Sequence, residues 1–353
     1  MSVPAAYTCT NSDDQSTMNR QVNLLTFPLD DLAFGNSPYL LSGPERDYFF
    51  YRDAKGKWLW KEKSSAGWVE HGELPRQGVQ LCAVLDRHGS PHLVIYEKGI
   101  FYHLIAEQDL FTESEFYLED SKMCSHFLLG CDAENNLHLL YLALDSKDSR
   151  WWLLHHRRTA RGWEEPRVID FGGGNAVNYG DIAVDSNNTL HLLYRINEHE
   201  QTSLYYRHFS PVAQNWSKAL PLASGSEISF PAVTVDSEQN IHTLWSSGDQ
   251  SGHRLHYRAM IRGGWPSGGW KPAAAISPVL EYRVFPFFGL HGQDLIMAWL
   301  DAHNVTFFRY RKHSWEKAPP LVIEEPQLAR HCSAAAPGGL FPLWILAKDG
   351  VPV

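Results

Sequence analysis

Four Asp/His pairs recur along the chain with one spacing, and both side chains can do chemistry. In each pair the His follows the Asp by six residues: Asp86/His92, Asp132/His138, Asp185/His191 and Asp236/His242. Carboxylate and imidazole groups bind metal ions and transfer protons. A metal needs its ligands within about 2–2.6 Å, and groups in separate repeats should lie too far apart. We therefore expect no metal site. We interpret each His as a packing residue bonded to neighbouring backbone, and each Asp as a turn cap.

A repeating hydrophobic frame surrounds each pair, seen most clearly at residues 182–194 and 233–245. An apolar strand ends at the Asp, a short polar turn follows, and a second strand carries the His. A third strand is rich in aromatic residues and Arg, and a fourth opens with Trp, often after Gly. The four Asp positions are 46, 53 and 51 residues apart. A period of this length indicates a propeller or another repeat array.

Degenerate copies extend this frame to seven units, with Ser42, Leu290 and Ala335 in the Asp position. We predict an all-β protein without long helices: a single seven-bladed β-propeller. The last unit is short, so a strand at residues 22–27 is expected to complete it and close the ring. Residues 1–20 are expected to be a flexible tail, and residues 21–353 the propeller domain. A six-bladed ring is the alternative.

Composition excludes several classes of partner. The 353 residues carry a net charge of −9, which disfavours binding to nucleic acid and to anionic lipid. No apolar run reaches the roughly 18 residues of a membrane span, and the first residues do not resemble a secretion signal. The five Cys are odd in number and irregularly spaced, which indicates reduced thiols. We expect a cytoplasmic protein without a cofactor.

The frame resembles the repeats of sialidase-like (BNR-repeat-type) β-propeller proteins over about residues 37–350. Enzymes of that superfamily carry a turn of the form Ser-x-Asp-x-Gly-x-x-Trp between the third and fourth strands. The corresponding turns here, residues 158–163 and 210–216, keep only the terminal Trp. Sialidases also have six blades and need three convergent Arg, a Tyr/Glu pair and an acidic Asp, which this chain does not match residue by residue. The resemblance thus implies the architecture, while these departures argue against glycosidase activity.

Residues in the loops at one end of the blades differ from repeat to repeat, whereas the frame does not. A ligand site needs different groups at different points, so we expect binding at this loop face. The face is formed by the loops between blades and by the loops between second and third strands. The candidate ligand-binding residues are Tyr179, Asp181, Arg195, Glu198, Trp245, Arg283, Trp299 and Arg330. Glu281 and Tyr282 are candidate catalytic residues, because a carboxylate-activated Tyr can act as a glycosidase nucleophile. His253 and His256 form a lone pair without a third metal ligand.

We interpret the chain as a non-catalytic binding protein of the sialidase-like propeller type, with a glycan or a protein as its partner on the loop face. One alternative is a glycoside hydrolase with a degenerate sialidase-like site. The other is a scaffold that holds proteins on its flat faces. The sequence leaves open whether the chain is an enzyme.

Overall fold

The described part of the chain consists of strands and turns and contains no helix. The computed structural model describes residues 39–353 except 44, 54, 65–66, 108–109, 118–122, 146–149, 174–179, 199–200, 262–268, 282–284, 292–293, 302–303, 312–313, 318–320, 323–326, 334–339 and 347–353. The all-β prediction is confirmed over these residues. The expected tail, the strand at residues 22–27 and the Asp position of Ala335 lie outside them.

The strands form six sheets, A to F; in each, consecutive strands pair antiparallel, and sheet A also takes in two strands from the end of the chain. Sheet A contains β1 (Tyr39–Ser42), β2 (Asp47–Arg52), β3 (Trp58–Ser64) and β4 (Gly67–Glu73), together with β28 (Gln327–Ser333) and β29 (Leu340–Leu346). Sheet B contains β5 (Gln80–Leu85), β6 (Pro91–Glu97), β7 (Ile100–Glu107) and β8 (Leu110–Tyr117). Sheet C contains β9 (Met123–Cys131), β10 (Leu137–Asp145), β11 (Arg150–Thr159), β12 (Gly162–Trp163) and β13 (Arg167–Gly173).

The second half of the chain repeats this arrangement. Sheet D contains β14 (Gly180–Val184), β15 (Leu190–Glu198), β16 (Gln201–Ser210), β17 (Asn215–Trp216) and β18 (Leu220–Gly225). Sheet E contains β19 (Glu227–Val235), β20 (Ile241–Asp249), β21 (Gly252–Met260) and β22 (Ala274–Ala275). Sheet F contains β23 (Phe285–His291), β24 (Asp294–Asp301), β25 (Asn304–Arg311), β26 (Ser314–Lys317) and β27 (Leu321–Val322).

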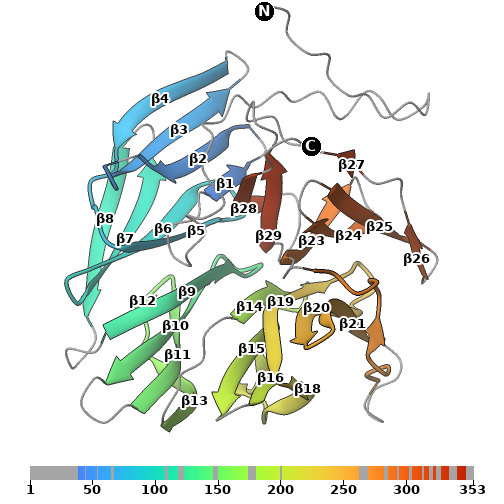
Figure 1. Ribbon diagram of the computed structural model, residues 1–353. Helices are drawn as coiled ribbons and strands as arrows, with labels where there is room; N and C mark the ends of the chain where they lie inside the picture. The colour runs from blue at the N-terminus through green and yellow to red at the C-terminus, as the bar shows by residue number, and fades with distance from the viewer. Residues whose placement is uncertain are drawn as a thin grey trace, which may run out of the picture.

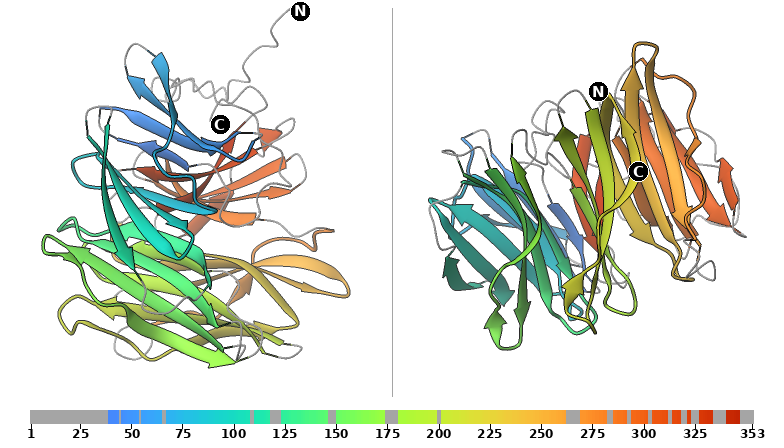
Figure 2. Two further views of the ribbon diagram at one scale, coloured as in Figure 1. Left: turned by 90° about the vertical axis from the view of Figure 1, so that its left-hand side faces the viewer. Right: turned by 90° about the horizontal axis from the view of Figure 1, so that it is seen from below.

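The sheets stand around a common axis like the blades of a propeller (Figure 1), and Figure 2 shows them from the side. Their first strands contact one another in the order β1, β5, β9, β14, β19 and β23, and β23 also contacts β29. β28 pairs in parallel with β1, with Tyr39 opposite Arg330, so early and late residues share sheet A. This pairing covers the edge of β1, which would otherwise be open to another strand. No helix in the described ranges is long and apolar enough to cross a membrane.

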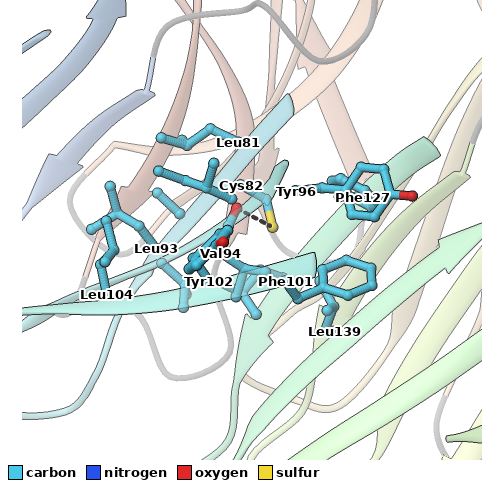
Figure 3. Packing of buried hydrophobic residues seen from close by; sticks show 14 of the residues in the cluster. Leu81, Cys82, Leu93, Val94, Tyr96, Phe101, Tyr102, Leu104, Phe127 and Leu139 are labelled. Carbon is cyan, nitrogen blue, oxygen red and sulfur yellow. Dashed lines mark hydrogen bonds between the residues drawn. The ribbon is translucent and has the colours of Figure 1, made fainter. Parts of the chain in front are cut away.

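Sheets B to E are covered on both faces by their neighbours, which explains the nearly continuous apolar runs of their second strands. In β15, Leu192 and Tyr194 pack toward sheet C, while Leu193 packs toward sheet E. A strand buried on both faces loses the alternation of a half-exposed strand. Figure 3 shows the same arrangement in sheet B, where Leu93, Phe101 and their neighbours form a closely packed cluster.

The four repeated Asp residues cap the turns between first and second strands, as predicted. In every copy Oδ1 accepts hydrogen bonds of 2.8–2.9 Å from the backbone N–H groups two and four residues later. The turn is a three-residue hairpin loop whose last residue has a positive φ: Gly89, Asn135, Asn188 or Gln239. Sheet F differs, because His291 pairs with Asp294 and Leu290 lies inside β23, where it pairs with Leu295. Leu290 is therefore not in a turn-capping position.

These turns also bond to one another around the ring. Asn135 Oδ1 accepts a hydrogen bond from the backbone N–H of Arg87, and Asn188 Oδ1 accepts one from the backbone N–H of Ala133. Asn187 Nδ2 continues the series by donating to Gln239 Oε1. The turns of sheets B to E are thereby joined by hydrogen bonds from each sheet to the next, and their polar groups stabilise the fold.

The repeated His residues lie between sheets and bind side chains, so the expectation that they bind backbone is wrong. Each Nε2 lies 3.0–3.6 Å from Oδ2 of the Asp six residues earlier. Each Nδ1 lies 2.7–3.0 Å from a group on the third strand, and these groups are His103, His155, Tyr206 and Tyr257. A buried imidazole needs partners for both nitrogens, and side chains reach them more directly than a backbone already bonded in the sheet.

The fourth-strand Trp residues pack between blades, as their recurrence predicted. Trp163 meets His103 of the preceding sheet edge to face at 5.5 Å, and Trp270 meets Tyr206 at 5.1 Å. The third-strand Arg residues also join sheets: Arg258 Nη1 donates to the Leu222 carbonyl at 2.9 Å. These aromatic and Arg residues therefore join neighbouring blades.

Candidate functional site

The loop end of the blades is the place to seek a site, because the framework uses the repeated polar groups at the other end. Within the described residues, no group of three or more His, Cys, Asp and Glu side chains is arranged to hold a metal ion. One row of non-repeating polar groups lies at the loop end of sheet E. We call the surroundings of Glu227, Gly248, His253 and Glu281 the E–F junction.

Two side chains of sheet D form hydrogen bonds with the backbone of β19. β19 carries a bulge between Ser229 and Ala232, and Phe230 within it has a φ of 50°. Asp181 Oδ2 accepts a 2.8 Å hydrogen bond from the Val233 N–H beyond the bulge. Arg195 donates to the Ile228 carbonyl before it. These two contacts fix the irregular backbone from both sides, and bulges commonly redirect a strand end near a site.

Glu227, Gly248 and His253 form one row across sheet E. Glu227 pairs with Gly248 on β20, which pairs with His253 on β21, so all three occupy one face of the sheet. A Cβ atom placed on Gly248 would lie 2.7 Å from Glu227 Oε2 and 2.6 Å from His253 Nδ1. A carboxylate and an imidazole thus converge over the middle strand, and glycine is the residue that leaves them room.

Two hydroxyl groups lie on the same face, one step further into the sheet. Ser229 and Ser246 face each other across β19 and β20, and their side chains are 3% and 0% exposed. Neither Oγ has a hydrogen-bond partner in the described part of the chain. His253 Nδ1 also has none there. Because buried polar groups are normally satisfied, three such atoms on one sheet face mark it as a place for a polar ligand or water.

The segment between β22 and β23 supplies the other side of the junction. Leu280 exchanges two backbone hydrogen bonds with His253, of 2.9 and 2.8 Å, which places the exposed Glu281 next to the imidazole-bearing residue. Leu280 also packs with Leu255 and Trp299 in an apolar cluster beneath. The junction therefore combines an apolar base with polar groups at the surface.

Charged side chains also follow the row at the ends of β20 and β21. Asp249 comes directly after Gly248 in β20, so its side chain points to the opposite face of the sheet, and Arg254 lies near its carboxyl. Hydrogen bonds from the Ser251 hydroxyl and N–H, with the nearby Arg254 charge, hold the pKa of the Asp249 carboxyl below its usual range. Asp249 therefore carries its negative charge through the neutral range.

The structure corrects three of the residues expected to bind ligand. Trp245 is 2% exposed and stacks on His256, and Trp299 is 3% exposed and stacks on Phe308. Both rings fill the core because an aromatic in this repeated position packs against the neighbouring sheet. Asp181 is 5% exposed and binds backbone, as described above.

The other expected residues are placed as follows. Arg195 is half-buried and donates a hydrogen bond to the Ile228 carbonyl of β19. Glu281 lies exposed at the E–F junction. Glu198 ends β15 and Arg330 lies in β28, but their side chains are outside the described part. Tyr179, Tyr282 and Arg283 lie outside the described residues altogether.

One buried Tyr–carboxylate pair elsewhere resembles a nucleophile arrangement but is structural. Tyr194 donates to Asp170 Oδ2 at 2.6 Å, and Arg207 Nε donates to the same phenol oxygen at 3.1 Å. Tyr194 is fully buried, and burial, followed by the Asp170 hydrogen bond, raises the pKa of its hydroxyl far above the usual value. A neutral, inaccessible phenol joins sheets C and D and does not attack a substrate.

Sequence reasoning missed Gly248 and His253. The spacing of Gly248 and His253 matches no known motif. His253 and His256 lie on opposite faces of β21, so they do not form the pair that their spacing in the sequence suggested. No sequence signal marked this position, because the aromatic-Arg pattern of β21 begins at Leu255, after His253.

Comparisons with known proteins show the fold alone. No family model matches the chain, and no curated protein is similar in sequence. Among solved structures, the chain is similar to a polysaccharide lyase, an ulvan lyase bound to -[GlcA(1-4)Rha3S]-, with a TM-score of 0.63, 10% identity, and coverage of 94% of this chain and 97% of that one. It is also similar to the polysaccharide lyase Uly1, with a TM-score of 0.55, 8% identity, and coverage of 95% and 94%. A protein from Lactobacillus plantarum matches with a TM-score of 0.52, 10% identity, and coverage of 86% and 88%.

Proposed function

We propose that this chain is a carbohydrate-binding β-propeller protein that holds a glycan at the loop face, with the E–F junction as the centre of its site. The observation that carries the proposal is the convergence of Glu227 and His253 over Gly248. This row belongs to no repeated contact of the framework. A carboxylate and an imidazole with adjacent hydroxyls supply the acceptors and donors that bind sugar hydroxyls.

The composition of the junction supports a sugar ligand further. Sugars present hydroxyl groups around an apolar ring face, and the junction has polar groups above a base of Leu255, Leu280 and Trp299. Two proteins of similar fold are polysaccharide lyases, so an arrangement of sheets of this kind accommodates glycan chains. We also propose that the propeller is of the sialidase-like type, as the sequence of the repeat indicates.

The proposal includes seven blades closed within residues 21–353. β28 and β29 have the position of a first and second strand of a seventh blade, next to β1 and β23. In this proposal residues 22–27 supply its outer strand. Deletion of residues 1–27 would then destabilise the protein, whereas deletion of residues 1–20 would not, as measured by thermal unfolding.

A glycan array with the purified full chain tests the function. Binding to defined glycans supports the proposal, and absence of binding to every glycan, together with recovery of a stable protein complex, supports the scaffold alternative. Glu281 beside His253 favours one further candidate, a glycoside-processing enzyme. Turnover of a bound glycan that is lost in both Glu281→Gln and Tyr282→Phe would establish that alternative.

A further inference from the structure

We propose that the His138–His155 pair, together with the Trp216 indole, forms an acid-sensitive contact between sheets C and D. The contact binds no further proton while the two sheets are joined, so mildly acidic solution favours states in which Trp216 has left His155. It lies in a different part of the fold from the E–F junction and does not depend on glycan binding.

The direction of the hydrogen bonds leaves no place for another proton. The Trp216 indole N–H can only donate, so His155 Nδ1, 3.2 Å away, accepts from it. The proton of the His155 imidazole is therefore on Nε2, which donates to His138 Nδ1 at 2.9 Å. A second proton would have to bind at His155 Nδ1, where it would face the indole N–H. Two donors cannot bond to each other, so the Trp216 hydrogen bond would break.

Burial keeps water from replacing a lost partner. His138 and His155 are each 1% exposed. Phe209 and Trp216 of sheet D meet the His155 imidazole edge to face, with ring centroids 4.9 and 5.4 Å away, and neither residue titrates. An imidazolium at this place would be desolvated, and desolvation disfavours the charged form.

The charged groups of sheet C also oppose a positive charge on His155. The guanidinium groups of Arg157 and Arg167 act on the imidazole, and Glu164 pairs with both of them, at 3.8 and 3.3 Å. His156 is the next residue of β11 and faces sheet B, where it contacts Phe116.

The electrostatic surroundings agree with the direction of the hydrogen bonds. Burial, followed by the charges of His138 and of the two nearby Arg residues, holds the pKa of His155 well below its usual value. The carboxylate of Asp132 lies on the far side of His138, with Oδ2 3.3 Å from His138 Nε2. The negative charge therefore stabilises a proton on His138 Nε2 and not on His155 Nδ1.

The corresponding contacts of sheets B, D and E end in a hydroxyl group. Tyr206 and Tyr257 occupy the position of His155 in sheets D and E, and their hydroxyls lie 2.8 and 2.7 Å from Nδ1 of the repeated His. In sheet B the position is occupied by His103, whose Nδ1 lies 3.4 Å from the Ser114 hydroxyl. A hydroxyl accepts as well as donates, so these contacts can reverse when a proton is added. The contact that ends in an indole cannot.

The pH range follows from the direction of the pKa shift. The folded-state pKa of His155 lies below the unfolded value of about 6.5, so the unfolded chain binds more protons. The stability that His155 contributes is therefore complete above about pH 6.5 and is lost as the pH falls toward the folded-state pKa. The carboxyl groups of the turn-capping Asp residues titrate only below about pH 3.9, so the two effects occupy separate ranges.

Urea unfolding of the full chain at about pH 7 and about pH 5 tests the proposal in the parent protein, His155→Tyr and His155→Gln. Tyr is the residue at this position in sheets D and E, and Gln supplies one acceptor and one donor without titrating. His88→Gln is the matched control, because it removes an exposed imidazole from a turn of sheet B. Imidazole ¹⁵N spectra of the folded parent show the protonation of His155 directly.

Between these two pH values we expect the unfolding constant of the parent to rise by a factor about 25 times larger than that of His155→Tyr, and His88→Gln to match the parent. The folded parent is expected to keep His155 neutral at both pH values. Equal rises in the parent and in both His155 variants would overturn the proposal, and so would protonation of His155 in the folded parent near its unfolded pKa. If His155→Tyr fails to fold, His155→Gln decides.

Discussion

The Trp216 indole donates a hydrogen bond to Nδ1 of His155 at 3.2 Å, joining sheet D to sheet C. Because the indole N–H can only donate, His155 Nδ1 must accept, and the proton of this neutral imidazole is on Nε2. His155 Nε2 then donates to His138 Nδ1, 2.9 Å away. His138 in turn carries its proton on Nε2, which faces Asp132 Oδ2 at 3.3 Å. One donor-only group thus orients a chain of four side chains across two blades.

This series of hydrogen bonds predicts the tautomers of two buried His residues. Burial, with the neighbouring positive charges, holds the pKa of His155 well below its usual value. We expect both His138 and His155 to carry their proton on Nε2 near neutral pH. Long-range ¹H–¹⁵N correlation spectra of the imidazole rings measure this directly. An Nδ1-protonated tautomer at His155 would disprove the direction of the chain.

Replacing Trp216 by Phe is expected to lower the free energy of unfolding by about 1–3 kcal/mol more than the same change at Trp163. Both residues occupy the same place in the repeat, but Trp163 Nε1 is buried without a hydrogen-bond partner among the described residues. Trp163→Phe therefore controls for lost packing. Urea unfolding of the two variants gives the difference, and equal losses would show that the Trp216 hydrogen bond contributes nothing.

Acid should destabilise the protein through its four turn-capping Asp residues. Burial alone would raise the pKa of the Asp132 carboxyl, but hydrogen bonds from His138 and Asn136 outweigh it and lower the pKa. The same direction holds for Asp86, Asp185 and Asp236. A folded-state pKa below the unfolded value of about 3.9 means that this stability is present above that pH and is lost as the pH falls through the folded-state value.

Asp132→Asn removes that titration while it keeps an acceptor for the turn. We expect about 1–3 kcal/mol lower stability at neutral pH and a smaller loss of stability between neutral and strongly acidic pH than in the parent protein. Chemical unfolding at a series of pH values measures both quantities. A parallel pH profile for variant and parent would rule out the proposed linkage.

Two adjacent glycines in β13 give a sharp steric test. A Cβ on Gly172 would lie 2.7 Å from the Trp151 ring, whereas one on Gly173 would meet nothing within 4 Å. Gly172→Ala is expected to cost about 1–3 kcal/mol of stability, and Gly173→Ala no more than about 0.5 kcal/mol. Thermal unfolding compares them. A similar cost in both would show that the Trp151 contact does not determine the effect of the added methyl group.

The framework was predictable from the sequence because its contacts repeat at a fixed spacing. Each Asp caps its own turn and faces a His six residues away, so local sequence carries the information. Sheet F has Leu290 in the Asp position and lacks this signal, and Leu290 pairs with Leu295 inside the strands. The sheet order followed from the repeat, whereas the parallel pairing of β1 with β28 was not anticipated.

The candidate site was much less predictable. Glu227, Gly248 and His253 come from three strands, and the contribution of Gly248 is the absence of a side chain. No spacing rule links such residues until the register of the sheet is known. The aromatic candidates Trp245 and Trp299 failed for the opposite reason: their recurrence reports packing between blades, which the sequence does not distinguish from sugar stacking.

The most direct test of the proposed site is to follow the imidazole nitrogens of all His residues while the tightest-binding glycan is titrated into the full chain. We predict that the His253 signals shift on binding, while those of the framework residues His138 and His155 stay in place. A saturating glycan that leaves His253 unchanged would contradict the assignment of the site to the E–F junction.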